Sequence, residues 1–234
     1  MKVYRGNWRW FFRRFWLPAY RWWALRHIRR EQVFRYGSLR LTIPAGVFHP
    51  GVFFSTPVFL DFLDTINFQH KKVLDVGTGS GALALLAARR GAVVTALDIN
   101  LLALEAARQN AAVNRLPAQF VHSDLFDALP PQHFDLLLIN PPYYARTPGN
   151  NAERAFFAGE GLEYFEKLFR QLPGFLHSSS QVYMILSEDC DLKKIQELAG
   201  LNRLSLRCIL ERKKWGERQL IFEITSAAIT FLKL

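Results

Sequence analysis

The sequence predicts an α/β protein built on a mostly parallel sheet, and three observations indicate this class. From Lys71 onward, apolar runs of strand length alternate with longer segments of helical periodicity. One run ends in the glycine-rich turn 77–81, which is typical of a strand that leads into a helix. The chain of 234 residues is 50% apolar and has only two cysteines. It is therefore long enough for one well-buried domain, and no disulfide framework is expected.

The alternation sets the expected order of the elements. Strands are predicted at 72–76, 92–97, 118–122, 134–139 and 181–186, and helices at 81–90, 101–113, 161–172 and 191–199. A further helix is expected from about Pro57 to Ile66, capped by Ser55 or Thr56, because proline is favoured at the first helical position. The last two runs, 204–211 and 218–226, flank a turn at 213–216 and predict an antiparallel hairpin.

The first 30 residues differ from the rest of the chain in composition. They hold nine Lys or Arg, no Asp or Glu, and five of the six tryptophans. Nearly all of the net charge of +10 therefore lies in this segment. We expect a helix over 8–35 that Pro18 kinks or breaks, then a strand or hairpin between Gly37 and Gly46. The chain is thus divided into a basic, aromatic N-terminal helical arm, residues 1–36, and a main domain, residues 37–234.

Several interpretations of the arm remain open. Its aromatic side chains can pack on the main domain, or its arginines can bind RNA phosphates while the aromatics stack on bases. A basic amphipathic helix can also lie on an anionic membrane surface, or bind an acidic protein. Five tryptophans exceed what one helix normally buries, so we favour a partner, with RNA first. The uncharged stretch 15–20 is too short for a signal peptide or a membrane span, and a cytoplasmic location is expected.

The glycine turn has the features of a ligand site. Gly77 and Gly79 let a ligand approach the backbone closely, because no Cβ intervenes. Asp75 precedes the turn by two residues, and its carboxylate suits a cationic ligand end better than a phosphate. A plain strand-to-helix turn and a nicotinamide-binding turn are the alternatives.

Two further carboxylates follow predicted strands. Asp98 lies 21 residues after Gly77, where a carboxylate can accept both hydroxyls of a ribose. Asp124 can accept an adenine amino group while Leu125 or Phe126 packs on the ring. Each carboxylate also has a structural alternative, because Asp98 can cap the helix 101–113 and Asp124 can form a turn.

The tetrapeptide Asn140-Pro141-Pro142-Tyr143 follows a buried run directly. The nitrogen of an amide or a nucleobase is a poor nucleophile, because its lone pair is delocalised. The side-chain oxygen of Asn140 and the carbonyl of Pro141 can accept hydrogen bonds from such a nitrogen, and the prolines hold these acceptors still. Tyr143 offers a face for a planar group. The tetrapeptide therefore predicts chemistry at a planar nitrogen.

The block from Gly46 to about Leu172 resembles the class I S-adenosylmethionine-dependent methyltransferases with an NPPY motif. It is most similar to their small-domain members, which include release-factor glutamine and RNA base-amino methyltransferases. The resemblance implies a Rossmann-like, seven-stranded sheet with a reversed last strand and S-adenosylmethionine as cofactor. It implies that Asn140, Pro141 and Tyr143 hold the target nitrogen. It also implies cofactor contacts from Asp75, Gly77, Thr78, Gly79, Gly81, Asp98, Asp124, Leu125 and Asn140.

The expected methyl acceptor is an exocyclic base amino group in tRNA or rRNA, because of the charge of the arm. The second reading is a glutamine amide in a release factor or another protein. Against it, the short arm replaces the helical N-terminal domain that is usual in the bacterial glutamine enzymes. The third reading is a non-catalytic RNA- or membrane-binding module, which the intact tetrapeptide argues against. The six histidines lack metal-ligand spacing, so no metal is expected.

Overall fold

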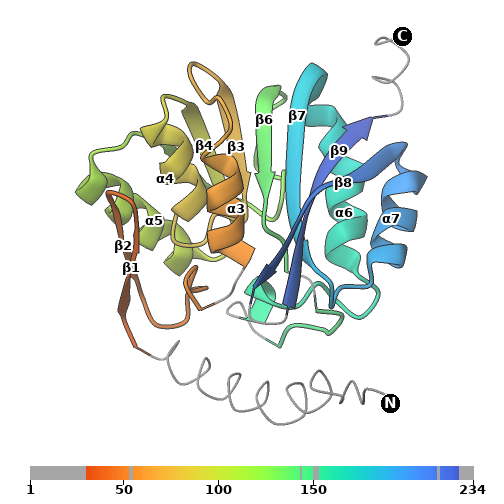
Figure 1. Ribbon diagram of the computed structural model, residues 1–234, viewed down its shortest axis with the longest axis horizontal. Helices are drawn as coiled ribbons and strands as arrows, with labels where there is room; N and C mark the ends of the chain where they lie inside the picture. The colour runs from red at the N-terminus through yellow and green to blue at the C-terminus, as the bar shows by residue number, and fades with distance from the viewer. Residues whose placement is uncertain (1–29, 53–54, 143, 150–152, 215–216, 227–234) are drawn as a thin grey trace, which may run out of the picture.

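The computed structural model describes residues 30–52, 55–142, 144–149, 153–214 and 217–226 (Figure 1). Most of the N-terminal arm, Tyr143 and Trp215 lie outside these residues, so the expectations placed on them stay predictions. The domain boundary after residue 36 likewise stays a prediction. Among the described residues, no helix is long and apolar enough to cross a membrane.

A seven-stranded sheet forms the centre of the molecule, in the order β5-β4-β3-β6-β7-β9-β8. Neighbouring strands from β5 to β7 run parallel. Strand β9 (Glu217–Ser226) runs antiparallel to β7 and pairs with β8 (Leu204–Lys214) as a hairpin. The predicted α/β class and the antiparallel C-terminal hairpin are therefore confirmed. The parallel strands are β3 (Lys72–Val76), β4 (Val93–Asp98), β5 (Gln119–His122), β6 (Phe134–Ile139) and β7 (Leu176–Ser187).

Helices cover both faces of the sheet (Figure 1). The side chains of β6 alternate between these two faces. Leu136 and Leu138 belong to the core on one face, whereas Leu137 and Ile139 belong to the core on the other. Because both faces are covered, this strand is apolar from Leu136 to Ile139. The first of these faces is covered by α3 (Ser55–Leu63), α4 (Ala82–Arg89) and α5 (Leu101–Asn114), and the second by α6 (Glu163–Gln171) and α7 (Leu192–Leu201). Two short 3₁₀ helices, η2 (Glu153–Ala155) and η3 (Leu172–Phe175), flank α6.

Several elements begin at positions that differ from the expected ones. Strand β7 starts at Leu176, well before the predicted strand 181–186. Helix α3 starts at Ser55, so Ser55 and Thr56 lie in its first turn and do not cap it. Helix α7 is capped by Asp191, whose side chain accepts a hydrogen bond from the backbone N of Lys194 at 3.1 Å.

A two-stranded hairpin precedes the sheet. It pairs β1 (Gln32–Tyr36) with β2 (Leu39–Ile43) around Gly37, which has a φ of +55°. The helix expected over 8–35 is therefore wrong for residues 32–35, which form a strand. Phe34 and Tyr36 pack against the core, whereas the alternate residues are exposed, which is the period of a strand.

Helix α5 holds this hairpin through two asparagines. The Asn110 side chain accepts from the Thr42 backbone N at 2.8 Å and donates to the Thr42 carbonyl at 3.0 Å. Its Nδ2 also donates to the Ser80 carbonyl at 3.0 Å. Asn114 accepts from the backbone N of Arg40 and donates to its carbonyl, at 3.0 and 2.8 Å. These bonds provide partners for the backbone N and carbonyl groups at the free edge of β2, and they connect the hairpin to the glycine turn.

Candidate active site

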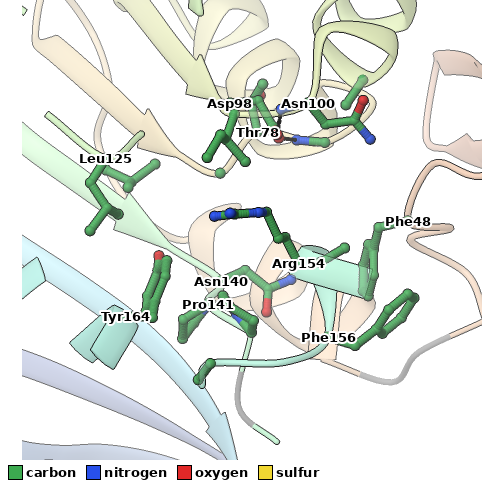
Figure 2. Close-up of a pocket in the computed structure, with 18 of the residues that line it drawn as sticks. Phe48, Thr78, Asp98, Asn100, Leu125, Asn140, Pro141, Arg154, Phe156 and Tyr164 are labelled. Carbon is green, nitrogen blue, oxygen red and sulfur yellow. Dashed lines mark hydrogen bonds between the residues drawn. The ribbon is translucent and has the colours of Figure 1, made fainter. Parts of the chain in front are cut away.

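A cavity of about 470 Å³ opens at the carboxyl edge of β3, β4 and β6 (Figure 2). The strands end level here, because Val76 of β3 pairs with Leu97 of β4 and with Ile139 of β6. In parallel sheets this edge is where ligands bind, and small-molecule sites commonly have volumes of about 300–1,000 Å³. Of the residues predicted from the sequence, those that line the cavity are Gly77, Thr78, Gly79, Asp98, Asp124, Leu125, Asn140 and Pro141.

The two glycines at 77 and 79 leave part of the cavity wall without side chains. Gly77 and Gly79 have φ angles of +76° and +55°, and a Cβ at either position would meet no atom within 4 Å. Any side chain there would thus project into open space. The backbone N atoms of Gly77 and Thr78 donate to the Leu97 carbonyl at 2.9 and 2.8 Å, so they are not free for a ligand. The turn therefore fits a ligand that passes close over the backbone.

Asp98 connects the glycine turn to the start of α5. Its Oδ2 accepts from the Gly79 backbone N at 2.8 Å, and its Oδ1 accepts from the Asn100 backbone N at 2.9 Å. Burial raises the pKa of Asp98, and these two hydrogen bonds oppose that shift. Each oxygen keeps a further lone pair, so the carboxylate can still accept hydrogen bonds from vicinal hydroxyls.

The structure does not bring Asp75 and Gly81 into the cavity wall. Asp75 is fully buried behind the turn, where its Oδ2 accepts from the Thr78 hydroxyl at 2.7 Å and the Ala84 backbone N at 3.0 Å. A Cβ on Gly81 would lie 3.3 Å from the Cβ of Ala107, so this glycine allows α4 to approach α5. Both residues hold the turn in place from behind, and the expected direct cofactor contact stays a prediction for them.

The burial of Asp75 gives a pH prediction. Burial raises its pKa to about 7, although the hydrogen bonds from Thr78 and Ala84 oppose the shift. A carboxyl group whose pKa is raised by folding favours the folded state most below its unfolded pKa, and this contribution disappears as the pH rises through the folded value. Relative to Asp75→Asn, the free energy of unfolding of the natural chain is expected to fall by up to about 4 kcal/mol between about pH 4 and pH 7.

Urea denaturation of the two chains across this pH range measures the difference. Asparagine keeps an oxygen that can accept from Thr78 and Ala84, so the variant retains the turn. An identical pH dependence for both chains would contradict the assignment of this titration to Asp75.

Asp124 is paired with a cation that the sequence analysis missed. The Nζ of Lys167, on α6, lies 2.8 Å from the Oδ2 of Asp124 and 2.7 Å from the Oδ2 of Asp127. The Oδ1 of Asp124 forms no hydrogen bond with the residues that the structure describes. Leu125 is buried, has a φ of 53°, and contributes an apolar side chain to the cavity wall (Figure 2). This end of the cavity therefore combines an available carboxylate oxygen with an apolar surface.

A residue from α3 fixes the orientation of the Asn140 amide. The Nδ2 of Asn140 donates to the hydroxyl of Thr56 at 3.1 Å, and Thr56 is buried. Because the nitrogen is engaged there, the Oδ1 of Asn140 is the atom left to accept a hydrogen bond in the cavity. The sequence indicated Thr56 only as a helix cap. No local pattern connects it to Asn140, since the two residues are 84 positions apart.

Aromatic and basic side chains from several separate segments complete the cavity. The rings of Phe48 and Phe156 lie 5.8 Å apart beside Asn140 (Figure 2). Arg154, on η2, extends its guanidinium into the cavity and forms no ion pair with any residue that the structure describes. Tyr164, on α6, lines the opposite wall. These residues come from separate segments, and nothing in the sequence pattern singled them out.

Among the described residues, no group of three or more His, Cys, Asp or Glu side chains is placed to hold a metal ion. The cavity instead offers carboxylate and amide acceptors at three strand ends, an exposed stretch of backbone, and aromatic faces. Such a set suits an uncharged or cationic nucleoside-like ligand next to a second, planar group.

The fold and the cavity together define an α/β protein with a nucleoside-sized ligand site at the carboxyl edge of its sheet. The chain belongs to the methyltransferase small domain family, whose model matches residues 38–195. The match begins within the hairpin and includes the glycine turn, Asp98, Asp124 and the Asn140 segment.

Two kinds of methyltransferase are among the relatives of the chain. It is 33% identical over 125 residues to a release factor glutamine methyltransferase of Lactococcus lactis, covering 48% of this chain and 46% of the relative. It is 44% identical over 79 residues to a tRNA adenine-N6 methyltransferase of Vibrio campbellii, covering 32% of this chain and 33% of the relative. The chain therefore spans less than half the length of either relative.

A solved structure shares the fold. The 16S rRNA N2 methyltransferase of T. thermophilus, in complex with AdoMet and guanosine, superposes with a TM-score of 0.61 at 22% identity. The match covers 83% of this chain and 50% of that one. At this identity the likeness confirms the Rossmann-like methyltransferase fold.

Proposed function

We propose that the protein is an S-adenosylmethionine-dependent methyltransferase that acts on a planar amino or amide nitrogen. The observation behind this proposal is the Asn140 amide. Thr56 holds its nitrogen at 3.1 Å and leaves its oxygen for the cavity that the glycine turn and Asp98 also line. The membership of the family supports the same reaction class.

The residues of the cavity fit the parts of this cofactor. Asp98 would accept hydrogen bonds from the ribose hydroxyls, and the Oδ1 of Asp124 would accept from the adenine amino group beside Leu125. The backbone of Gly77 and Gly79 would lie against the ligand without a side chain between them. When bound, S-adenosylmethionine supplies a methyl group that its sulfonium activates, so the site needs no strong general base.

The target nitrogen would be held by the Asn140 segment. The Oδ1 of Asn140 and the carbonyl of Pro141 would accept hydrogen bonds from its N–H groups, which favours a more pyramidal and more nucleophilic nitrogen. Because Thr56 fixes the amide, the acceptor does not have to reorganise during the reaction. Tyr143 would stack on the planar group, a role that lies outside the described residues.

The favoured methyl acceptor is an exocyclic base amino group in a cytoplasmic tRNA or rRNA. Nine basic residues and no acidic ones in the first 30 residues suit a phosphate backbone. The guanidinium of Arg154 is a further cation at the cavity, and the rings of Phe48 and Phe156 are suited to stacking on a base. One of the relatives is a tRNA adenine-N6 methyltransferase, which supports this choice.

A glutamine side-chain amide in a release factor or another protein is the second candidate. It is supported by the relative that is a release factor glutamine methyltransferase. An amide and a base amino group present the same planar, delocalised nitrogen, so the Asn140 site suits both. In that case the arm would be a protein-docking element.

A transfer assay with tritium-labelled S-adenosylmethionine separates the two acceptors. Deproteinised RNA and total protein of the host serve as separate substrates, with Asn140→Ala as the blank. Label in a discrete RNA band supports the base-amino proposal, whereas label in one protein band alone moves the assignment to the glutamine class. A chain that binds the cofactor and labels neither fraction would support the non-catalytic module.

Removing the arm tests the RNA proposal separately. Deleting residues 1–30 is expected to weaken RNA binding and to flatten its dependence on salt, because fewer counterions are released. If about half of the nine cations contact phosphates, the slope of log K against log salt changes by about 3. Filter binding of host tRNA at several salt concentrations measures this slope.

The matched control keeps the charge of the arm. Replacing its arginines with lysines should leave the slope nearly unchanged while altering stacking contacts. An unchanged slope after the deletion, together with lost solubility, would show that the arm packs on the main domain.

A further inference from the structure

The hydroxyl of Tyr164 is a buried polar group without a protein partner. Tyr164 lies in the first turn of α6 and lines the cavity, and Figure 2 shows its hydroxyl directed into the space between Leu125 and Arg154. The oxygen is inaccessible to solvent, and no residue that the structure describes forms a hydrogen bond with it. Buried hydroxyls are normally hydrogen-bonded, so this one points to a partner that is not part of the chain.

The packing of Tyr164 does not need the oxygen. Its ring packs edge-on against Phe165 at 5.4 Å, a contact that a phenylalanine would make equally well. Leaving a buried donor unpaired is unfavourable, whereas a ligand that accepts its hydrogen bond removes the penalty on binding. The hydroxyl is therefore better explained by the ligand of the cavity than by the stability of α6.

The surroundings of Tyr164 determine which kind of atom it can bind. Burial raises the pKa of Tyr164, and the negative charges of Asp98, Asp124 and Asp75 raise it further. The side chain therefore stays protonated and acts as a hydrogen-bond donor. Its partner must be an acceptor atom of the ligand.

The donors of an adenosyl group are already matched in this cavity. The carboxylates of Asp98 and Asp124 would take the ribose hydroxyls and the adenine amino group, and both can only accept when ionised. The adenine ring nitrogens are acceptors that neither carboxylate can serve. The protonated hydroxyl of Tyr164 is a donor, so it can bind a ring nitrogen that the two carboxylates cannot.

We propose that the Tyr164 hydroxyl donates a hydrogen bond to a ring nitrogen of the cofactor's adenine and so contributes to selection of the adenosyl group. This inference rests on the proposed function, because it takes S-adenosylmethionine as the ligand. Tyr164 is then a cofactor-binding residue on α6, a helix to which the sequence analysis assigned no part of the site.

Isothermal titration of the full chain with S-adenosylhomocysteine tests the proposal. Tyr164→Phe removes only the oxygen, and it is expected to weaken binding about 10-fold. The 1-deaza, 3-deaza and 7-deaza analogues of the ligand each lack one ring nitrogen. One of them should bind the natural chain about 10-fold more weakly and lose nothing further in Tyr164→Phe, because the two changes remove the same hydrogen bond.

Thermal unfolding distinguishes this role from a structural one. Without ligand, Tyr164→Phe should unfold at the same or a higher temperature than the natural chain, since it removes an unpaired buried group. The stabilisation that the ligand adds should be smaller in the variant. A lower melting temperature without ligand, with an unchanged ligand effect, would overturn the proposal.

Tyr183→Phe is the matched control. Tyr183 is also buried, but its hydroxyl accepts from the Gln181 side chain at 3.0 Å, and Tyr183 belongs to the core on the other face of the sheet. Its loss should leave the dissociation constant unchanged. Natural affinity in Tyr164→Phe, or equal further losses with all three analogues, would overturn the ring-nitrogen contact while the methyltransferase proposal stands. No binding of S-adenosylhomocysteine to the natural chain would instead overturn the proposed function.

Discussion

Asn140→Ala is expected to lower the rate of methyl transfer by about 10²–10³-fold, the size of effect seen when one preorganised polar contact to a transition state is lost. The variant removes the oxygen that would accept from the target nitrogen. It leaves the glycine turn and Asp98 intact, so the affinity for S-adenosylmethionine should stay close to that of the natural chain. Single-turnover transfer with the acceptor found in the tritium assay measures the rate, and isothermal titration measures the affinity.

Variants of Thr56, which binds the Asn140 side chain, distinguish the loss of the acceptor oxygen from the loss of its orientation. In Thr56→Val the amide oxygen remains, but the hydroxyl that accepts from its Nδ2 at 3.1 Å is lost. The rate should therefore fall by less than in Asn140→Ala, and Thr56→Ser should restore it. Full turnover in Asn140→Ala would show that the amide oxygen does not act on the target nitrogen.

The sequence alone predicted the sheet and the part of the cavity wall that lies at the strand ends, because both depend on local patterns. The strands β3 and β6 are mostly apolar and are largely buried on both faces, and each is followed at once by polar or glycine residues. Once such strands lie parallel, their carboxyl ends meet at one edge. This brings Gly79, Asp98 and Asn140 together without any knowledge of the side-chain packing.

Local sequence patterns do not predict contacts between segments that are distant in the chain. Thr56 reaches Asn140, and Lys167 reaches Asp124, only after α3 and α6 have packed on the sheet. The strand at 32–36 was missed for a similar reason. Its residues continue an aromatic and basic composition that fits a helix, and only pairing with β2 and burial of Phe34 against the core select the strand.

Asp75 shows a further limit of local patterns, because a pattern does not determine in which layer a side chain is buried. Its position before the glycine turn suggested contact with a cationic ligand. In the structure the carboxylate is enclosed and binds the hydroxyl of Thr78 and the backbone N of Ala84. The side chain thus shapes the turn that the ligand would meet, and it is Thr78 that lines the cavity.

Asp98→Ala is expected to weaken S-adenosylmethionine binding by about a hundredfold or more. Two effects act together in this variant. The proposed hydrogen bonds from the ribose hydroxyls to a charged group are lost, at about 1.5–3 kcal/mol each. The backbone N atoms of Gly79 and Asn100 also lose their acceptor, so the glycine turn is no longer held against the start of α5.

Two further variants serve as an intermediate case and a control for the Asp98→Ala titration. Asp98→Asn keeps one oxygen and exchanges the other for a donor, so its affinity should lie between those of the natural chain and Asp98→Ala. Glu105→Gln removes a charge from the exposed face of α5, where Glu105 contacts Gln109 and Arg108, and should leave the affinity unchanged. An unchanged affinity in Asp98→Ala would contradict the ribose site, because the carboxylate that joins the glycine turn to the start of α5 would then have no part in binding.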